Sequence, residues 1–197
     1  MRSHGAPVTV SLVPVSGLAR QIDVGPIEDV GDGGWLKDGR LILELKRPGA
    51  PWAVFAGPAT GGAFAPYLPA GMTLVSPRLF SPDGARVIAA GDSDSAQVCT
   101  LPSTGVGVCT PLPGLGEDHL AGWTADSRSV FVHRRYPVPV RIEKLDVTTG
   151  RREPFTTLQT ASATVSGLLN LIVTPSGVIV YNYARNRSQL YVISGLK

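Results

Sequence analysis

The chain has 197 residues, a formal net charge of +3, 43% hydrophobic residues and 17% charged residues. This apolar content is enough to form a core, which excludes an intrinsically disordered chain. No apolar stretch reaches the roughly 18 residues of a membrane helix, and no dense Lys/Arg run marks a nucleic-acid surface. We therefore expect a globular protein without membrane insertion or nucleic-acid binding.

Residues 1–27 predict half of a β-sheet unit. The segments VTVSLVPVSG and LARQIDV look like the third and fourth strands of a four-stranded unit whose first two strands are absent.

One turn phrase then recurs four times along the chain. It reads WLKDGRLIL from Trp35, FSPDGARVI from Phe80, WTADSRSVF from Trp123 and VTPSGVIVY from Val173, so that the copies start 45, 43 and 50 residues apart. A Thr-Gly or Ser-Gly pair follows each turn phrase with a similar period, at residues 60–61, 104–105, 149–150 and 194–195. A β-rich period of about 40–50 residues is typical of a β-propeller blade.

The repeat predicts an all-β propeller of four-stranded antiparallel blades. Its units are 28–70, 71–115, 116–160 and an incomplete 161–197, which form one domain together with 1–27. In the unit 71–115 we expect strands at Leu74–Phe80, Ala85–Ala90, Ala96–Leu101 and Val106–Pro111, each rich in residues that favour strands. In the last unit QLYVIS is the expected third strand. No segment shows a sustained helical periodicity, so we expect almost no helix.

The turn phrase has a physical explanation. Pro82 presets φ, Asp83 can bond its own backbone, and Gly84 accepts the positive φ of a tight hairpin. The large apolar residue that precedes them is expected to pack between blades, which places Trp35 and Trp123 in the core rather than on a binding face. The equivalent turn residues are Asp38 and Gly39, Asp126, and Ser176 and Gly177.

These residues resemble a known family. FSPDGARVIAAGDSDSAQVCTLPSTG is similar to a TolB-like β-propeller repeat, and KLDVTTGRREPF and SQLYVISGLK resemble the propeller that ends certain bacterial membrane-bound serine/threonine kinases. The resemblance covers roughly residues 28–197. Ser176 departs from it where Asp is usual, as do Leu36 and Lys37 where Ser-Pro is usual. The family implies a scaffold or sensor that binds proteins, peptides or small ligands, and the same fold also forms the lid of prolyl-oligopeptidase-like peptidases.

The strand count leaves the closure of the propeller open. Three complete units and two partial ones make about four and a half blades, which favours part of a larger propeller. A closed ring of four or five blades is the alternative. An open arc exposes sheet edges, so we expect a homodimer through those edges, or instability in isolation.

The two cysteines are the most specific local feature. Cys99 and Cys109 lie symmetrically about Thr104, so a hairpin centred there would place them opposite each other, within reach of a disulfide. Two buried thiols in a cytoplasmic protein are the alternative. A disulfide would favour an extracytoplasmic location.

Other patterns give little chemistry. His4, His119 and His133 are far apart in sequence and no His/Cys pair has metal-ligand spacing, while GDSDS at 91–95 fits a polar hairpin turn better than a calcium loop. No G-x-S-x-G elbow, kinase motif or phosphate loop is present, so we expect no catalytic residue, no metal and no cofactor. The cluster Arg134, Arg135 and Tyr136 follows a predicted strand and could be a recognition loop or simply solvated.

The sequence therefore favours a non-enzymatic binding or sensor propeller with a protein or peptide partner on one face, as in the C-terminal segment of a receptor-like kinase. The propeller of a peptidase that lacks its hydrolase domain is the alternative. An extracytoplasmic location is expected, and a cytoplasmic one is the alternative.

Overall fold

A computed structural model describes residues 8–75, 79–91, 95–134, 139–159 and 165–185, and all regular structure in these residues is β-strand. None of the described residues forms a helix long and apolar enough to cross a bilayer. By its internal contacts the chain divides into two units, residues 1–113 and 114–197.

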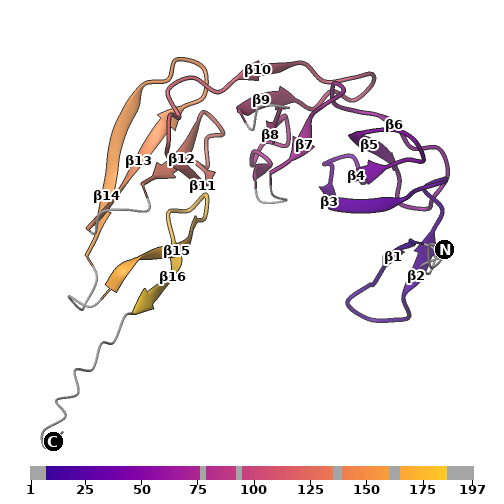
Figure 1. The fold of residues 1–197 in the computed structure, drawn as a ribbon, viewed down its shortest axis with the longest axis horizontal. Coiled ribbons are helices and arrows are strands. Elements are labelled where there is room, and N and C mark those ends of the chain that lie inside the picture. The colour runs from indigo at the N-terminus through magenta and orange to yellow at the C-terminus, as the bar shows by residue number, and fades with distance from the viewer. Residues whose placement is uncertain (1–7, 76–78, 92–94, 135–138, 160–164, 186–197) are drawn as a thin grey trace, which may run out of the picture. The chain divides into compact units, whose positions relative to one another are not determined.

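The first unit contains three antiparallel sheets, whose strands can be followed in Figure 1. The two-stranded sheet consists of β1 (Val10–Leu12) and β2 (Arg20–Ile22). The next has four strands in sequence order, β3 (Asp29–Trp35), β4 (Arg40–Lys46), β5 (Trp52–Pro58) and β6 (Ala65–Pro66). The third also has four, β7 (Thr73–Leu74), β8 (Arg86–Ala90), β9 (Ala96–Thr100) and β10 (Cys109–Pro111).

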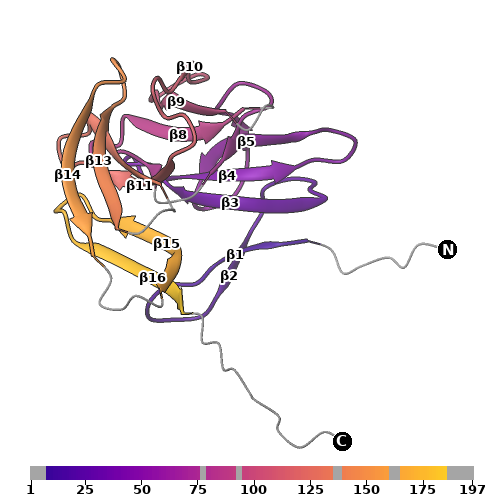
Figure 2. The same ribbon diagram turned by 60° about the vertical axis from the view of Figure 1, so that its left-hand side comes forward.

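The second unit contains two antiparallel sheets, both visible in Figure 2. One has four strands in sequence order, β11 (His119–Trp123), β12 (Ser129–His133), β13 (Val140–Asp146) and β14 (Arg152–Leu158). The other pairs β15 (Val165–Val173) with β16 (Ile179–Arg185). The expected third strand at QLYVIS lies outside the described residues. The prediction of an all-β fold built from four-stranded antiparallel sheets is confirmed.

The four turn phrases share one backbone geometry. The residue at the glycine position has a positive φ in every copy, at 84° for Gly39, 67° for Gly84, 58° for Ser127 and 87° for Gly177. Its amide donates to the carbonyl three residues earlier, as in Gly84 N to Ser81 O at 2.8 Å. Only glycine adopts this φ without a steric cost, so the sequence encodes the turn through that residue; Ser127 is the exception.

In three of these turns a hydroxyl lies two residues before the turn aspartate, or before Ser176 in the last copy. The Ser81 hydroxyl accepts a hydrogen bond from the Arg86 amide at 2.9 Å and lies 2.5 Å from the Asp83 carboxylate. Thr124 repeats the arrangement with Ser129 and Asp126, and the Thr174 hydroxyl accepts from the Val178 amide.

These hydrogen bonds lower the pKa of the turn aspartates below the usual range. For Asp83 the main cause is the Ser81 hydroxyl, and for Asp126 it is the Thr124 hydroxyl. Leu36 occupies the hydroxyl position in the first copy. There Asp38 pairs with Arg40 instead, 2.8 Å from its Nε, and that contact lowers the pKa of Asp38. The hydroxyl position is a part of the turn that the sequence pattern did not reveal.

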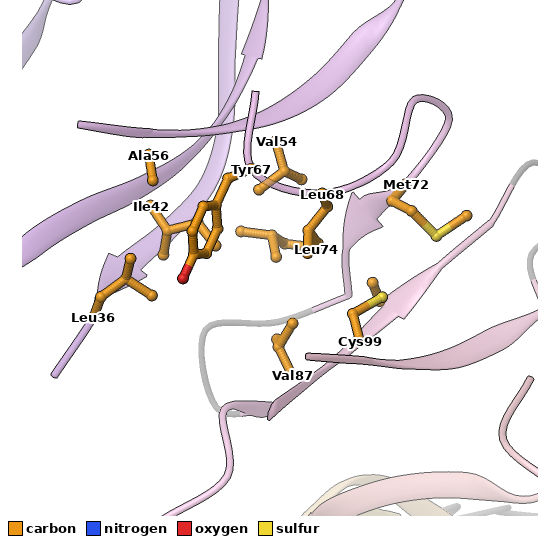
Figure 3. Packing of buried hydrophobic residues seen from close by; sticks show 11 residues of the cluster. Leu36, Ile42, Val54, Ala56, Tyr67, Leu68, Met72, Leu74, Val87 and Cys99 are labelled. Carbon is orange, nitrogen blue, oxygen red and sulfur yellow. The ribbon is translucent and has the colours of Figure 1, made fainter. Parts of the chain in front are cut away.

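A hydrophobic cluster joins the two four-stranded sheets of the first unit. Tyr67 and Leu68, from the segment that connects the sheets, are 3% and 2% exposed. Figure 3 shows them gathered with Ile42 of β4 and Leu74 of β7. Because each sheet exposes apolar side chains on both faces, it can bury them only against a neighbouring sheet.

Close packing between neighbouring sheets depends on a glycine in their first strands. A Cβ placed on Gly34 of β3 would lie 3.1 Å from the ring of Phe80. In the second unit a Cβ on Gly122 of β11 would collide with the carbonyl oxygen of Val173. In both cases the large residue that opens one turn phrase packs against the first strand of the sheet before it. The expected packing role of Phe80 agrees with this contact.

The two tryptophans of the turn phrases differ in burial. Trp123 is 1% exposed, as expected, but Trp35 is 58% exposed, so the prediction that Trp35 lies in the core is wrong. Trp35 pairs with Leu41 across β3 and β4, and Leu41 belongs to a cluster with Ile22 and Val24. The β1–β2 sheet covers this face over β4 and β5 and leaves Trp35 exposed.

Candidate functional site

The second unit carries a cluster of charged residues where the chain enters β11. Asp118 immediately precedes this strand, and its side chain is only 5% exposed although it is ionisable. Arg152, the first residue of β14, donates from Nη1 to Asp118 at 2.5 Å and to Glu143 of β13 at 2.8 Å. Buried carboxylates of this kind need such partners, because burial disfavours an unpaired charge.

Arg152 also fixes the segment that leads into β11. Its Nη2 donates to the carbonyl of Gly114 at 2.6 Å and to that of Leu115 at 3.2 Å. The hydrogen bonds to Glu143 and Asp118 raise the pKa of Arg152, against the opposing effect of burial. Arg152 therefore holds strands β13 and β14 and the preceding segment in one arrangement.

Arg134 reaches the same carboxylate from the other side. It follows β12, and its Nε donates to Asp118 at 3.1 Å while 68% of its side chain stays exposed. Asp118 therefore anchors the guanidinium of Arg134 through its Nε, while most of the side chain remains accessible to solvent. Arg134 is thus held at its Nε by Asp118, and the rest of its guanidinium is available to a ligand.

A cavity of 490 Å³ lies over this cluster. Three arginines outnumber two carboxylates in its described lining, and both carboxylates contact arginine. Arg141 of β13 is exposed, and no ion pair engages it within the described part of the chain. The cavity therefore favours an anionic group. Its described lining is Asp118, His133, Arg134, Pro139, Arg141, Glu143 and Arg152.

The structure brings together two histidines that are distant in sequence. His119 and His133 are opposite each other across β11 and β12, and their ring centroids are 5.6 Å apart. They are 14 residues apart in sequence, and the pairing of β11 with β12 closes this separation. His4 lies outside the described residues. Within those residues no group of three or more His, Cys, Asp or Glu side chains is arranged to hold a metal ion.

Of the other predicted site residues, only one is in the described lining of this cavity. Of the predicted recognition loop, Arg134 lines the cavity, whereas Arg135 and Tyr136 lie outside the described residues. In GDSDS the Gly91 amide donates to the Ser95 carbonyl between β8 and β9, and residues 92–94 lie outside the described part. The turn residues serve backbone hydrogen bonds as described above. Asp118, Glu143 and Arg152 were not identified from sequence, because they meet only through strand pairing.

A disulfide joins Cys99 of β9 to Cys109 of β10, with their Cα atoms 4.0 Å apart. The two residues are direct partners in the register of these strands. The loop that it closes contacts the segment that connects the two four-stranded sheets. There the Tyr67 hydroxyl donates to the Pro102 carbonyl at 2.6 Å and the Gly107 amide donates to the Tyr67 carbonyl at 2.8 Å. The disulfide therefore lies at a structural junction within the first unit.

No protein-family model and no curated protein sequence matches the chain. Solved structures do match. A putative TolB from Agrobacterium tumefaciens aligns with 90% of this chain and 63% of its own length, with a TM-score of 0.59 and 20% identity. TolB from Acinetobacter baumannii aligns with 84% of this chain and 45% of its own length, with a TM-score of 0.50 and 16% identity. The chain thus spans less than two thirds of either structure and shares the TolB β-propeller fold with them.

Proposed function

We propose that this chain is a non-enzymatic binding module that takes an acidic segment of a protein or peptide partner in the cavity beside Arg134. The observation that carries the proposal is the exposed end of Arg134, which Asp118 positions at a cavity where arginines outnumber carboxylates. Because fold alone does not specify function, the argument rests on the cavity.

The chemistry of arginine explains why the ligand would be a carboxylate. A guanidinium presents parallel N–H donors that match the two oxygens of a carboxylate. Arg134 is already oriented through its Nε, so a ligand would meet donors that need little further ordering. Arg141 supplies a second positive charge at the same cavity. An acidic side chain or a C-terminal carboxylate fits these donors, whereas a basic segment would be repelled.

Fluorescence anisotropy with labelled peptides tests this function. A Glu-rich peptide should bind, and a Lys-rich peptide of the same length should not. Arg134→Ala and Arg141→Ala should each weaken binding by about tenfold or more, since a hydrogen bond to a charged group contributes about 1.5–3 kcal/mol. Arg151→Ala is the matched control, because Arg151 is 78% exposed and pairs with Glu153 outside the cavity. Equal losses for all three variants, or no binding of the acidic peptide, would contradict the proposal.

We further propose that the parent protein is a receptor-like serine/threonine kinase. The resemblance of KLDVTTGRREPF and SQLYVISGLK to kinase-linked propellers supports this parent. Reading the complete gene tests it. A kinase core and a membrane helix encoded upstream are the expected result. A neighbouring α/β-hydrolase segment would instead favour the peptidase alternative and overturn the kinase parent.

The Cys99–Cys109 disulfide supports an extracytoplasmic location, because disulfides persist mainly in oxidising compartments. Thiol counting on protein taken directly from cells, denatured without reductant, tests this proposal. Zero titratable thiols are expected. Two titratable thiols would contradict both the bridge in vivo and the extracytoplasmic location.

A further inference from the structure

We propose that the acidic segment bound by this cavity also carries a basic residue, and that Glu143 is the residue that selects it. The inference rests on the proposed function, because it concerns the ligand of the same cavity. It adds one requirement to that ligand, which is a lysine or arginine side chain among the acidic ones.

The four charged residues of the cluster form a chain of alternating sign. Arg134 donates from Nε to Asp118 at 3.1 Å, and Arg152 donates to the same carboxylate at 2.5 Å. Arg152 also donates to Glu143 at 2.8 Å. The chain therefore has a positive end at Arg134 and a negative end at Glu143, and both ends line the cavity.

The two inner members of this chain are occupied within the protein. Asp118 accepts from Arg134 with one carboxylate oxygen and from Arg152 with the other, and its side chain is 5% exposed. Arg152 donates from Nη1 to two carboxylates and from Nη2 to two backbone carbonyls. These bonds use both hydrogens of each terminal nitrogen. A ligand therefore meets mainly the two ends of the chain.

Each end keeps atoms for hydrogen bonding that no described residue engages. Arg134 keeps its two terminal nitrogens, and 68% of its side chain is exposed. Glu143 contacts Arg152 through Oε2, which leaves Oε1 as an acceptor for a ligand, and 33% of its side chain is exposed. Of the two carboxylates in the described lining, Glu143 is thus the one that can still accept from outside.

Strand β13 presents charges of both signs to the same cavity. Arg141 lies two residues before Glu143, and the pairing of β13 with β12 is regular at these positions. Residues two apart in a strand point to the same face of the sheet. Within the described part of the chain these two side chains form no ion pair with each other. The cavity therefore offers donors at Arg134 and Arg141 and an acceptor at Glu143.

A purely acidic segment would leave a mismatch at Glu143. Its carboxylates would pair with Arg134 and Arg141, but one of them would lie near a carboxylate of the same sign, which repels it. A basic side chain at that point would replace the repulsion by an ion pair. A charge that only the correct ligand matches is a common source of specificity. Because arginines exceed carboxylates by one in the described lining, the matching segment remains acidic overall.

A lysine scan followed by fluorescence anisotropy tests this requirement. Each position of a Glu-rich peptide is replaced in turn by Lys in one series and by Gln in a second series. With the wild-type chain, at least one position should bind about fivefold more tightly with Lys than with Gln, the gain of a partly exposed ion pair. Attraction to the positive cavity alone predicts the opposite sign, because Lys lowers the negative charge of the peptide. Weaker or equal binding with Lys at every position would overturn the inference.

Glu143→Gln assigns the preference to this residue. Glutamine keeps an oxygen that can accept from Arg152 but has no charge, so the preference for Lys should disappear while the Gln peptide binds at least as tightly as before. Glu153→Gln is the matched control, because Glu153 is 58% exposed and pairs with Arg151 outside the described lining. Circular dichroism checks that both variants are folded. A preference that survives in folded Glu143→Gln, or that the control also loses, would refute the role of Glu143.

The inference and the proposed function fail in different ways. If no acidic peptide binds, with Lys or with Gln, the proposed function is wrong and the inference falls with it. If acidic peptides bind and Arg134→Ala weakens them, but Lys never improves binding, the proposed function stands and only the selection by Glu143 is refuted.

Discussion

Reducing the Cys99–Cys109 disulfide should destabilise the first unit by about 2.7 kcal/mol. The two cysteines are separated by 10 residues, and the loop-closure entropy that a cross-link of this length removes from the unfolded chain gives that value at 25 °C. Packing should change little, because Cys99 is 0% exposed and belongs with Cys109 to the cluster around Ile42. After reduction the two sulfurs need only move apart from bonding distance to van der Waals contact, so the loss of the cross-link is the main effect.

Hydrogen exchange in increasing urea is the appropriate assay, because it follows each unit separately. The β8 and β9 amides report on the first unit, and the β12 and β13 amides serve as the internal control. With urea m-values of about 1–3 kcal/mol/M, a loss of this size should lower the midpoint for β8 and β9 by roughly 1–3 M. The Cys99→Ala/Cys109→Ala variant should resemble the reduced wild type, at one fixed protein concentration for all samples.

The reasoning would be refuted by an unchanged midpoint for β8 and β9 after complete reduction. It would also be refuted if β12 and β13 shifted by the same amount, since the cross-link lies wholly within the first unit. The loop has other support, such as the 2.9 Å hydrogen bond from the Thr100 amide to the Val108 carbonyl. The loss should therefore appear as easier unfolding of the unit rather than as detachment of the loop.

Two further predictions concern the repeat itself. The lowered pKa of Asp126 contributes stability that is present above the unfolded pKa of about 3.9 and is lost as the pH falls through the folded pKa. Asp126→Asn keeps an oxygen acceptor but does not titrate. Acid titration of this variant should therefore show a shallower loss of stability of the second unit below pH 4. Gly122→Ala should cost more than about 3 kcal/mol in urea unfolding, because a Cβ there meets the Val173 carbonyl at a φ of 146°. Gly116→Ala is its control, with a positive φ of 58° but no atom within 4 Å, and equal costs would contradict the packing argument.

The fold could be predicted because the residues that form each turn all lie within the turn phrase itself. Asp83 and Gly84 form their turn through hydrogen bonds within six residues, so the pattern is visible in a short stretch of sequence. Repetition of that stretch then specifies the period and the sheet. The role of Ser81 was missed because serine is common in loops for many reasons and its hydroxyl contacts become visible only in three dimensions.

The candidate site was predictable only at its exposed end. Arg134 follows a predicted strand and so stood out as a loop residue. Asp118 and Arg152 did not, because they are 34 residues apart and meet only once all four strands β11 to β14 have paired in order. Arg152 is one of two consecutive arginines, and nothing in the sequence distinguishes it from the solvated Arg151 next to it. Pairing of buried charges across strands is a property of the register, which composition does not specify.

The two tryptophans of the turn phrases show that the position of a residue in a repeat does not by itself determine its burial. Trp35 and Trp123 occupy the same place in the turn phrase, yet one is exposed and the other buried. Gly34 and Gly122 precede them and mark first strands against which the next sheet packs closely. Ile172 stands at the corresponding place in β15, so the close approach that Gly34 and Gly122 allow is not available at that strand.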